Sequence, residues 1–136
     1  MADYRKLRVY QHSHALAVDT EKVVEGMRRS STRDLCDQLS RAARSIPANI
    51  AEGSEQDSYF QYARYLQYSL GSASELEEHV TMARDINAIT CVDFESLTKQ
   101  VVSVRRQLKR FRERVLERAE LSKKRLRSRK GKPRQK

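Results

Sequence analysis

Residues 94–115 carry the feature that most limits how this chain can fold. Apolar side chains recur there with alternating gaps of three and four residues, at Phe94, Leu97, Val101, Val104, Leu108, Phe111 and Val115. Residues three and four apart are neighbours on a helix surface, so this spacing places the whole set on one side of an α-helix. Such a helix cannot bury its apolar face alone, and the sequence therefore predicts packing against other helices.

Three further segments show helical periodicity, over about residues 6–29, 32–53 and 58–86. Their expected core positions are Val9, Tyr10, Leu16, Ala17, Thr20, Val23, Val24 and Met27, then Leu35, Leu39, Ala42, Ile46 and Ile50, then Tyr62, Leu66, Leu70, Ala73, Leu76, Val80 and Ala83. The chain has only 4 Gly and 2 Pro, which disfavours a strand-rich fold with many turns. The sequence predicts an all-α fold, an antiparallel up-down-up-down four-helix bundle.

Short polar motifs mark the ends of these helices. Ser58 with Gln61, and Thr90 with Asp93, have the spacing by which an N-cap side chain accepts a hydrogen bond from a backbone N–H three residues later. Gly53 stands where the second helix should stop, and we expect it to end that helix.

The segment SIPANIAEGS, residues 45–54, places a proline inside the second helix, where proline costs about 3 kcal/mol. The apolar phase continues through Pro47, which lies off the apolar stripe. We expect one bent helix with Pro47 toward solvent, the alternative being a fresh helix start at Ser45. Gln38, Ser45, Asn49 and Glu52 form a polar stripe beside the apolar one. Partial burial would give them an interhelical hydrogen-bond network or a subunit contact, the alternative being contact with a ligand.

The net charge of +10 is concentrated near the C-terminus. Residues 1–104 carry 12 Lys and Arg against 15 Asp and Glu, whereas residues 105–136 carry 16 against 3, so the two parts contribute −3 and +13. We divide the chain into a bundle, residues 1–120, and a basic tail, residues 121–136, which we expect to be disordered without a ligand. A folded module with a basic arm is typical of proteins that bind polyanions.

The candidate phosphate-binding side chains all lie in this basic segment. Those expected on the fourth helix are Arg105, Arg106, Lys109, Arg110, Arg112 and Arg114, and those expected on the flexible tail are Lys123, Lys124, Arg125, Arg127, Arg129 and Lys130. These side chains predict electrostatic binding of a nucleic acid, RNA in preference to DNA, with few contacts that distinguish one base from another. The alternative is that the tail only aids solubility. A membrane surface is a weaker partner, because the tail has no apolar face.

No catalytic or metal-binding constellation is evident. His12 and His14 are two residues apart and point to different sides of a helix. Glu75 and His79 are four apart, whereas a di-metal bundle uses Glu and His three apart on two helices. No phosphate-binding loop, nucleophile elbow or zinc-protease motif occurs. We therefore expect no enzyme, no metal site and no cofactor.

Four tyrosines, Tyr59, Tyr62, Tyr65 and Tyr68, recur at every third residue. A spacing of three drifts by about 60° per step around a helix, so their rings cannot form one stacking platform for bases. Some of them must be core or subunit contacts, with stacking on a base as the alternative for any one of them.

Cys36 and Cys91 show no metal or redox spacing, and we expect two buried or inert thiols in a cytoplasmic protein. The polar N-terminus does not resemble a secretory signal, and no window of 18 apolar residues suggests a membrane span.

The run SIPANIAEGS followed by YFQYARYLQYSLGSASELE resembles the bacterial family of 23S rRNA intervening-sequence proteins. LRVYQHSHALA is similar to the first helix of that family, which often has Trp where Tyr10 stands, and LCDQLSRAARSIPANIAEGS is similar to the second. The resemblance covers about residues 7–115. The family-motif positions in this chain are Ser45, Pro47, Asn49, Glu52, Gly53, Ser72 and Glu75.

The resemblance implies a left-handed bundle that assembles into a homopentamer and has no enzymatic activity. A related branch serves diversity-generating retroelements as an accessory protein that binds nucleic acid and a reverse transcriptase. The partners implied are therefore further copies of the chain and RNA or an RNA/DNA hybrid. The alternative function is an interaction scaffold that docks onto an enzyme such as a reverse transcriptase, through its acidic body and surface tyrosines.

Overall fold

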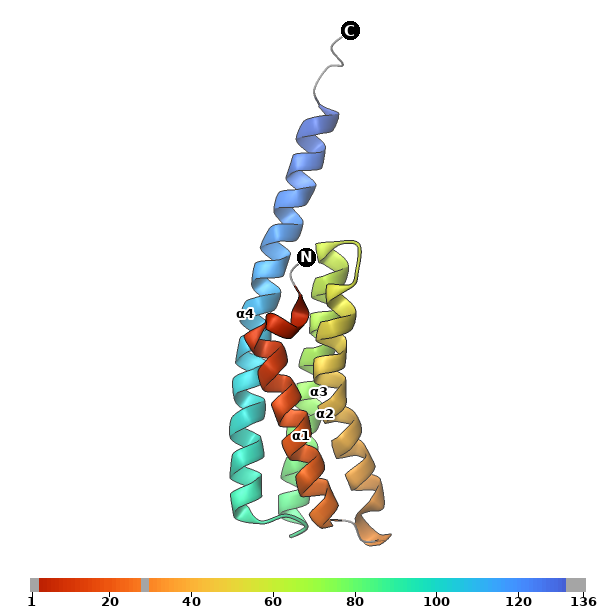
Figure 1. Cartoon of the computed structure of the whole chain (residues 1–136), viewed down its shortest axis with the longest axis vertical. Helices are drawn as coiled ribbons and strands as arrows, with labels where there is room; N and C mark the ends of the chain where they lie inside the picture. The colour runs from red at the N-terminus through yellow and green to blue at the C-terminus, as the bar shows by residue number, and fades with distance from the viewer. Residues whose placement is uncertain (1–2, 28–29, 132–136) are drawn as a thin grey trace.

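The computed structural model describes residues 3–27 and 30–131, and in that part of the chain every regular element is helical. The elements are η1 (Tyr4–Lys6), α1 (Arg8–Met27), η2 (Ser30–Thr32), α2 (Arg33–Ser54), α3 (Tyr59–Asp85) and α4 (Cys91–Lys130). Each α-helix packs against the next, and α4 also packs against α1, which closes the bundle (Figure 1). The predicted all-α, up-down-up-down four-helix bundle is confirmed. The expected last two residues of the first helix lie outside the described residues.

The heptad positions of α4 form the centre of the core. Leu97, Val101, Val104 and Leu108 are at most 2% exposed, and Ala119 continues the buried face beyond Val115. Leu16, Ile46 and Leu66, from the other three helices, are fully buried as well. The apolar periodicity of the sequence therefore identifies the faces that meet.

Backbone carbonyls accept the hydroxyl hydrogen bonds of three fully buried polar residues, Ser13, Thr20 and Ser69. The buried Ser69 of α3 donates its hydroxyl hydrogen bond to the Ile46 carbonyl of α2, at 2.8 Å. Asn49 is half-buried, as expected, but its amide donates to the Ser45 carbonyl within α2. In the described residues the hydrogen bond between α2 and α3 is therefore made by Ser69, and the expected interhelical network of the polar stripe is not seen.

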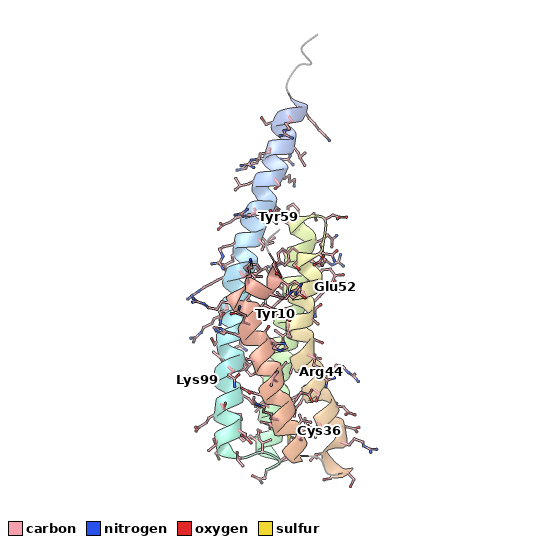
Figure 2. All side chains as sticks on the ribbon, in the orientation of Figure 1. Tyr10, Cys36, Arg44, Glu52, Tyr59 and Lys99 are labelled. Carbon is pink, nitrogen blue, oxygen red and sulfur yellow. The ribbon has the colours of Figure 1, made fainter. Side chains whose placement is uncertain are left out.

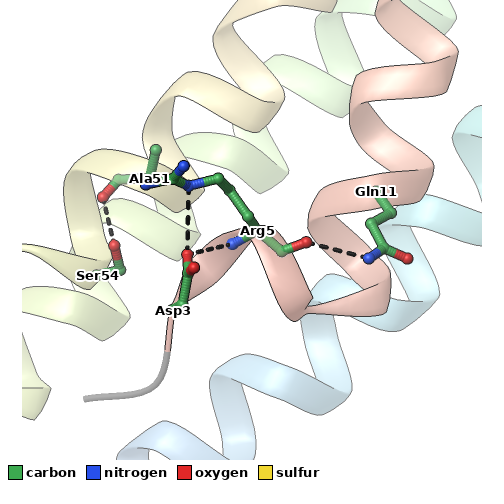
Figure 3. A network of polar contacts seen from close by, with 5 residues as sticks. All are labelled: Asp3, Arg5, Gln11, Ala51 and Ser54. Atoms are coloured by element: carbon green, nitrogen blue, oxygen red, sulfur yellow. Dashed lines mark hydrogen bonds and ion pairs between the residues drawn. The ribbon is translucent and has the colours of Figure 1, made fainter.

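Pro47 lies inside one continuous helix, as expected, but its predicted exposure to solvent is wrong, because Pro47 is buried. It shares the side of α2 that meets α1, where the Cys36 sulfur lies 4.0 Å from the Val24 carbonyl oxygen. The N-terminal turn η1 packs against α2 as well. Figure 3 shows Asp3 and Arg5 of this segment beside Ala51, one turn beyond Pro47. The apolar stripe of α2 is therefore wider than its periodicity alone indicates.

Gly53 does not end α2, which continues to Ser54, and its φ is not positive. A Cβ at this position would lie 2.8 Å from Tyr62 Cδ2 and 2.9 Å from Tyr65 Cβ, both on α3. Such distances are shorter than real Cβ contacts, so the residue is needed for close helix approach. The expectation of a terminating glycine is corrected to a glycine at a helix–helix contact.

The predicted caps of α3 and α4 are confirmed. Ser58 accepts a hydrogen bond from the Gln61 amide, and Thr90 accepts one from the Asp93 amide, both at 3.1 Å. The end of α3 uses Asn87, whose φ of 59° is left-handed. The backbone N–H of Ala88 then donates a hydrogen bond to the Ala83 carbonyl of α3, as in a Schellman motif. Asn87 can adopt the left-handed conformation that this chain reversal requires.

The last turns of α4 differ from the expected disorder. Residues 121–130 continue the helix and are exposed on all sides, and Figure 1 shows them projecting beyond the other helices. No glycine or proline interrupts residues 91–130, and the segment is rich in Lys, Arg, Glu and Leu, which favour helix. Residues 132–136 of the predicted tail lie outside the described residues. None of the described helices is both long and apolar enough to cross a bilayer.

The two cysteines differ in their surroundings. Cys36 is buried between α1 and α2, as expected, whereas Cys91 is exposed at the start of α4. Neither is in a disulfide. The prediction of a buried thiol therefore applies to Cys36 only.

Candidate nucleic-acid interface

The basic end of α4 leaves the bundle as a single helix. Ala119 is its last buried residue, and the helix runs on to Lys130, which is roughly 17 Å further along the axis. We call residues 120–131 the overhang. All of its side chains are exposed, and Figure 2 shows them projecting around the helix with no other helix beside it. The six tail candidates, Lys123, Lys124, Arg125, Arg127, Arg129 and Lys130, therefore lie on a helix that solvent surrounds.

The six candidates within the bundle are not equivalent. Arg105 forms an ion pair with Glu77 of α3, and Arg112 donates a hydrogen bond of 3.1 Å to the Ala63 carbonyl of α3. Both are half-buried, so they hold α4 against α3 as well as carrying charge. The other four are exposed: Arg106, Lys109, Arg110 and Arg114.

The charges of α4 are sorted onto different sides of the helix. At about 100° per residue, four arginines fall within about 60° of arc: Arg114, Arg118, Arg125 and Arg129. We call this set the arginine face. Of the three carboxylates of the segment, Glu113 and Glu120 fall on the far side of the helix, whereas Glu117 lies at the edge of the arginine face, about 60° from Arg114. In the described part of the chain, no arginine of this face takes part in an ion pair.

A pocket of about 300 Å³ opens where the arginine face meets the bundle. It is lined by Leu7, Tyr59, Tyr62, Phe111, Arg114, Val115 and Arg118. Phe111 packs edge-on against Tyr62, with ring centroids 5.6 Å apart, and the Arg114 guanidinium lies 5.8 Å from the Phe111 ring centre. Figure 2 shows Tyr59 at this end of the bundle, beside α4. The pocket thus has aromatic walls and two arginines at its rim.

Tyr62 forms the floor of this pocket and is only 5% exposed. Its burial raises the pKa of the phenol to about 12, because the charged phenolate is poorly solvated there. The neutral phenol is the form that the folded protein holds at ordinary pH.

Raising the pH from 10 to 12 is expected to lower the free energy of unfolding by up to about 2 kcal/mol through this group. The unfolded chain ionises Tyr62 near pH 10, whereas the folded chain does so near pH 12. Stability is therefore complete below pH 10 and is lost as the pH rises through this window. Urea unfolding of Tyr62→Phe should show a shallower pH dependence than the unaltered chain. Equal slopes would contradict the assignment.

A second, more polar groove of about 600 Å³ runs between α3 and α4. Its lining includes Gln67, Ser74, Arg105, Lys109 and Arg112. The position of Glu77 beside Arg105 reduces the positive charge available there. We therefore regard the overhang and the arginine face as the stronger anionic-ligand surface.

The family-motif positions lie mostly along the bundle and away from the overhang. Pro47 and Gly53 are buried, Ser45, Asn49 and Ser72 are half-buried, and Glu52 and Glu75 are exposed. Glu75 is therefore a surface carboxylate, while its neighbour Glu77 is paired with Arg105. In residues 3–27 and 30–131 there is no cluster of three metal-ligating side chains.

Two residues of the pocket rim were not predicted as site residues from the sequence. In the sequence, Arg118 stands three residues after Val115, the last apolar position of the heptad, and Tyr59 is one of the four spaced tyrosines. The helical periodicity could have identified Arg118, because a helix places it on the same side as Arg114, Arg125 and Arg129. No sequence signal indicates that Leu7 would come near them.

Comparison with known proteins gives a family and a fold. A sequence model described as "23S rRNA-intervening sequence protein" matches residues 5–110. A crystal structure from Bacteroides thetaiotaomicron, described as a protein with unknown function from the S23 ribosomal protein family, superposes with a TM-score of 0.70. It is 23% identical and covers 74% of this chain and 94% of its own. This likeness shows the fold alone. No curated protein matches. The overhang lies beyond the matched residues.

Proposed function

The chain belongs to the 23S rRNA-intervening sequence protein family, and from this premise we propose that it is a non-enzymatic bundle that binds nucleic acid, RNA before DNA. The observation that carries the proposal is the overhang, a helix that presents six exposed candidate cations beyond the bundle: Lys123, Lys124, Arg125, Arg127, Arg129 and Lys130. Arg106, Lys109, Arg110 and Arg114 extend the same charge along the bundle.

The physical basis of this binding is the release of counterions. Lysine and arginine side chains that neutralise phosphates free the condensed cations of the nucleic acid, so affinity falls steeply with salt. Contacts of this kind place a strand on the protein without reading its bases. Residues 1–104 carry a net charge of −3, so this part of the bundle repels the phosphates. The strand therefore stays near the overhang.

Replacing the six overhang cations by glutamine is expected to weaken binding of single-stranded RNA at least about tenfold and to flatten its salt dependence. If the six overhang cations neutralise six phosphates, they contribute about −4 to the slope of log K against log salt for a single strand, and the slope of the variant should be shallower by about that amount. The measurement is fluorescence anisotropy with a labelled RNA, and with a DNA of equal length, across a salt series.

The matched control removes the same charge from the body of the bundle. Glutamine replaces six exposed cations that lie outside the pocket and the overhang: Lys22, Arg33, Arg41, Arg44, Arg84 and Lys99. This variant should keep most of the affinity and most of the slope. Equal weakening by both variants would show that net charge alone matters, and the overhang would not be a specific arm.

A second proposal concerns association with protein partners. Phe60, Tyr68 and Met82 are 44–48% exposed and lie on one outward face of α3. Exposed apolar side chains in a row favour contact with another protein surface. We propose that copies of the chain associate through such faces, in fives by the resemblance, or that an enzyme such as a reverse transcriptase docks there. Light scattering of the unaltered chain and of Phe60→Ser/Met82→Ser tests it: a monomer in both would argue against self-association.

A further inference from the structure

The pocket beneath the overhang has a chemistry that phosphate binding does not require. Phosphates need only exposed cations, which the overhang supplies. The pocket instead has three aromatic rings, from Tyr59, Tyr62 and Phe111, with Arg114 and Arg118 at its rim. Its ligand should therefore combine a flat apolar part with an adjoining negative charge.

We propose that this pocket takes one unstacked nucleobase of a single strand, and that the adjoining phosphates lie along the arginine face. This inference rests on the proposed nucleic-acid binding and adds a preference to it. A nucleobase is planar and can stack on aromatic rings, whichever base it is. The phosphate of the same nucleotide then lies close enough to contact a guanidinium group at the rim of the pocket.

The size of the pocket favours a single base. Its volume of about 300 Å³ is at the lower end of ligand pockets, so it suits one ring system. The bases of a duplex are paired and stacked, and entering the pocket would require one of them to leave the stack. The bases of a single strand are already unpaired, so moving one of them into the pocket costs less free energy. The pocket therefore predicts a preference for single strands over duplexes of equal charge.

The arrangement of charge gives the strand its direction. Arg114 and Arg118 at the rim are followed on the same side of α4 by Arg125 and Arg129. The carboxylates Glu113 and Glu120 face another side of the helix, and Glu117 lies at the edge of the arginine face, about 60° from Arg114. A strand that leaves the pocket along the middle of the arginine face therefore meets four guanidinium groups, and the nearest carboxylate of α4 is at its edge.

Tyr59→Leu in the full chain tests the proposal. Leucine keeps an apolar side chain against the bundle but removes the ring. We expect binding of a single-stranded RNA to weaken about tenfold, within the range measured for loss of one base–aromatic stack. Binding of a duplex of equal charge should stay within about twofold. Phe94→Leu is the control, because Phe94 is a half-buried aromatic residue near the start of α4, outside the pocket lining.

The outcomes separate this inference from the proposed function. If single strand and duplex both bind, and Tyr59→Leu affects neither or both equally, the pocket does not hold a base although the arm binds phosphates. If neither nucleic acid binds the unaltered chain, the proposed function fails, and this inference with it.

A second measurement does not depend on the folding of a variant. An RNA containing 5-iodouridine is bound to the unaltered chain and irradiated, and the cross-linked peptide is identified by mass spectrometry. Cross-links to Tyr59, Tyr62 or Phe111 are expected. Cross-links confined to the tyrosines outside the pocket, or to no aromatic residue, would overturn the proposal.

Discussion

Replacing Leu108 by alanine is expected to lower the free energy of unfolding by about 2–5 kcal/mol. Leu108 is fully buried in the heptad face of α4, where that face meets the other helices. Truncation removes apolar contacts and leaves a cavity that a well-packed bundle can fill only in part. Urea unfolding, followed by circular dichroism, measures the change. The midpoint should fall while the slope stays similar, because the surface exposed on unfolding changes little.

Leu126 offers a matched control for this prediction. It lies eighteen residues beyond Leu108, or about five turns, so both side chains point to the same side of α4. Leu126 is 60% exposed, however, because the bundle has ended. Leu126→Ala should change the free energy of unfolding by no more than about 0.5 kcal/mol. A large loss from Leu126→Ala would mean that the overhang is packed in solution, for example against another copy.

Replacing Gly53 by valine is expected to lower the free energy of unfolding by about 3 kcal/mol, near the upper end of the cost of overpacking. A Cβ alone would lie 2.9 Å from the Tyr65 Cβ, which is close to the α3 backbone and cannot swing away. The two further methyl groups of valine would push α2 and α3 apart. The same unfolding measurement applies, and the slope reports whether the native bundle has loosened.

Gly71 is the matched control for Gly53. It is also a glycine inside a helix, but it is exposed, and nothing lies within 4 Å of a Cβ placed there. Gly71→Ala should raise the free energy of unfolding by up to about 1 kcal/mol, because alanine favours helix more than glycine does. Similar stabilisation from Gly53→Ala would contradict the tight contact between α2 and α3.

The candidate site was predicted from the sequence in its charge but not in its shape. The count of Lys and Arg after residue 105 marks the basic segment. Charge composition does not state, however, that Arg105 is paired with Glu77 or that Arg112 bonds to the α3 backbone. Those contacts depend on how closely α4 approaches α3. The aromatic pocket depends on three separate segments meeting at one end of the bundle, so no local pattern predicts it.

The sequence by itself determined the helical fold, the antiparallel order, the core faces and the caps at Ser58 and Thr90. These features follow from spacing and from interactions between residues close in the chain, which every helix of this kind obeys. The continuation of α4 over residues 121–130 also follows from local helix propensity, although the high charge of the segment predicts disorder. Only the tertiary structure decided that Pro47 is buried and that Gly53 lies against Tyr65. Both depend on the distance between helix axes, which no spacing within one helix specifies.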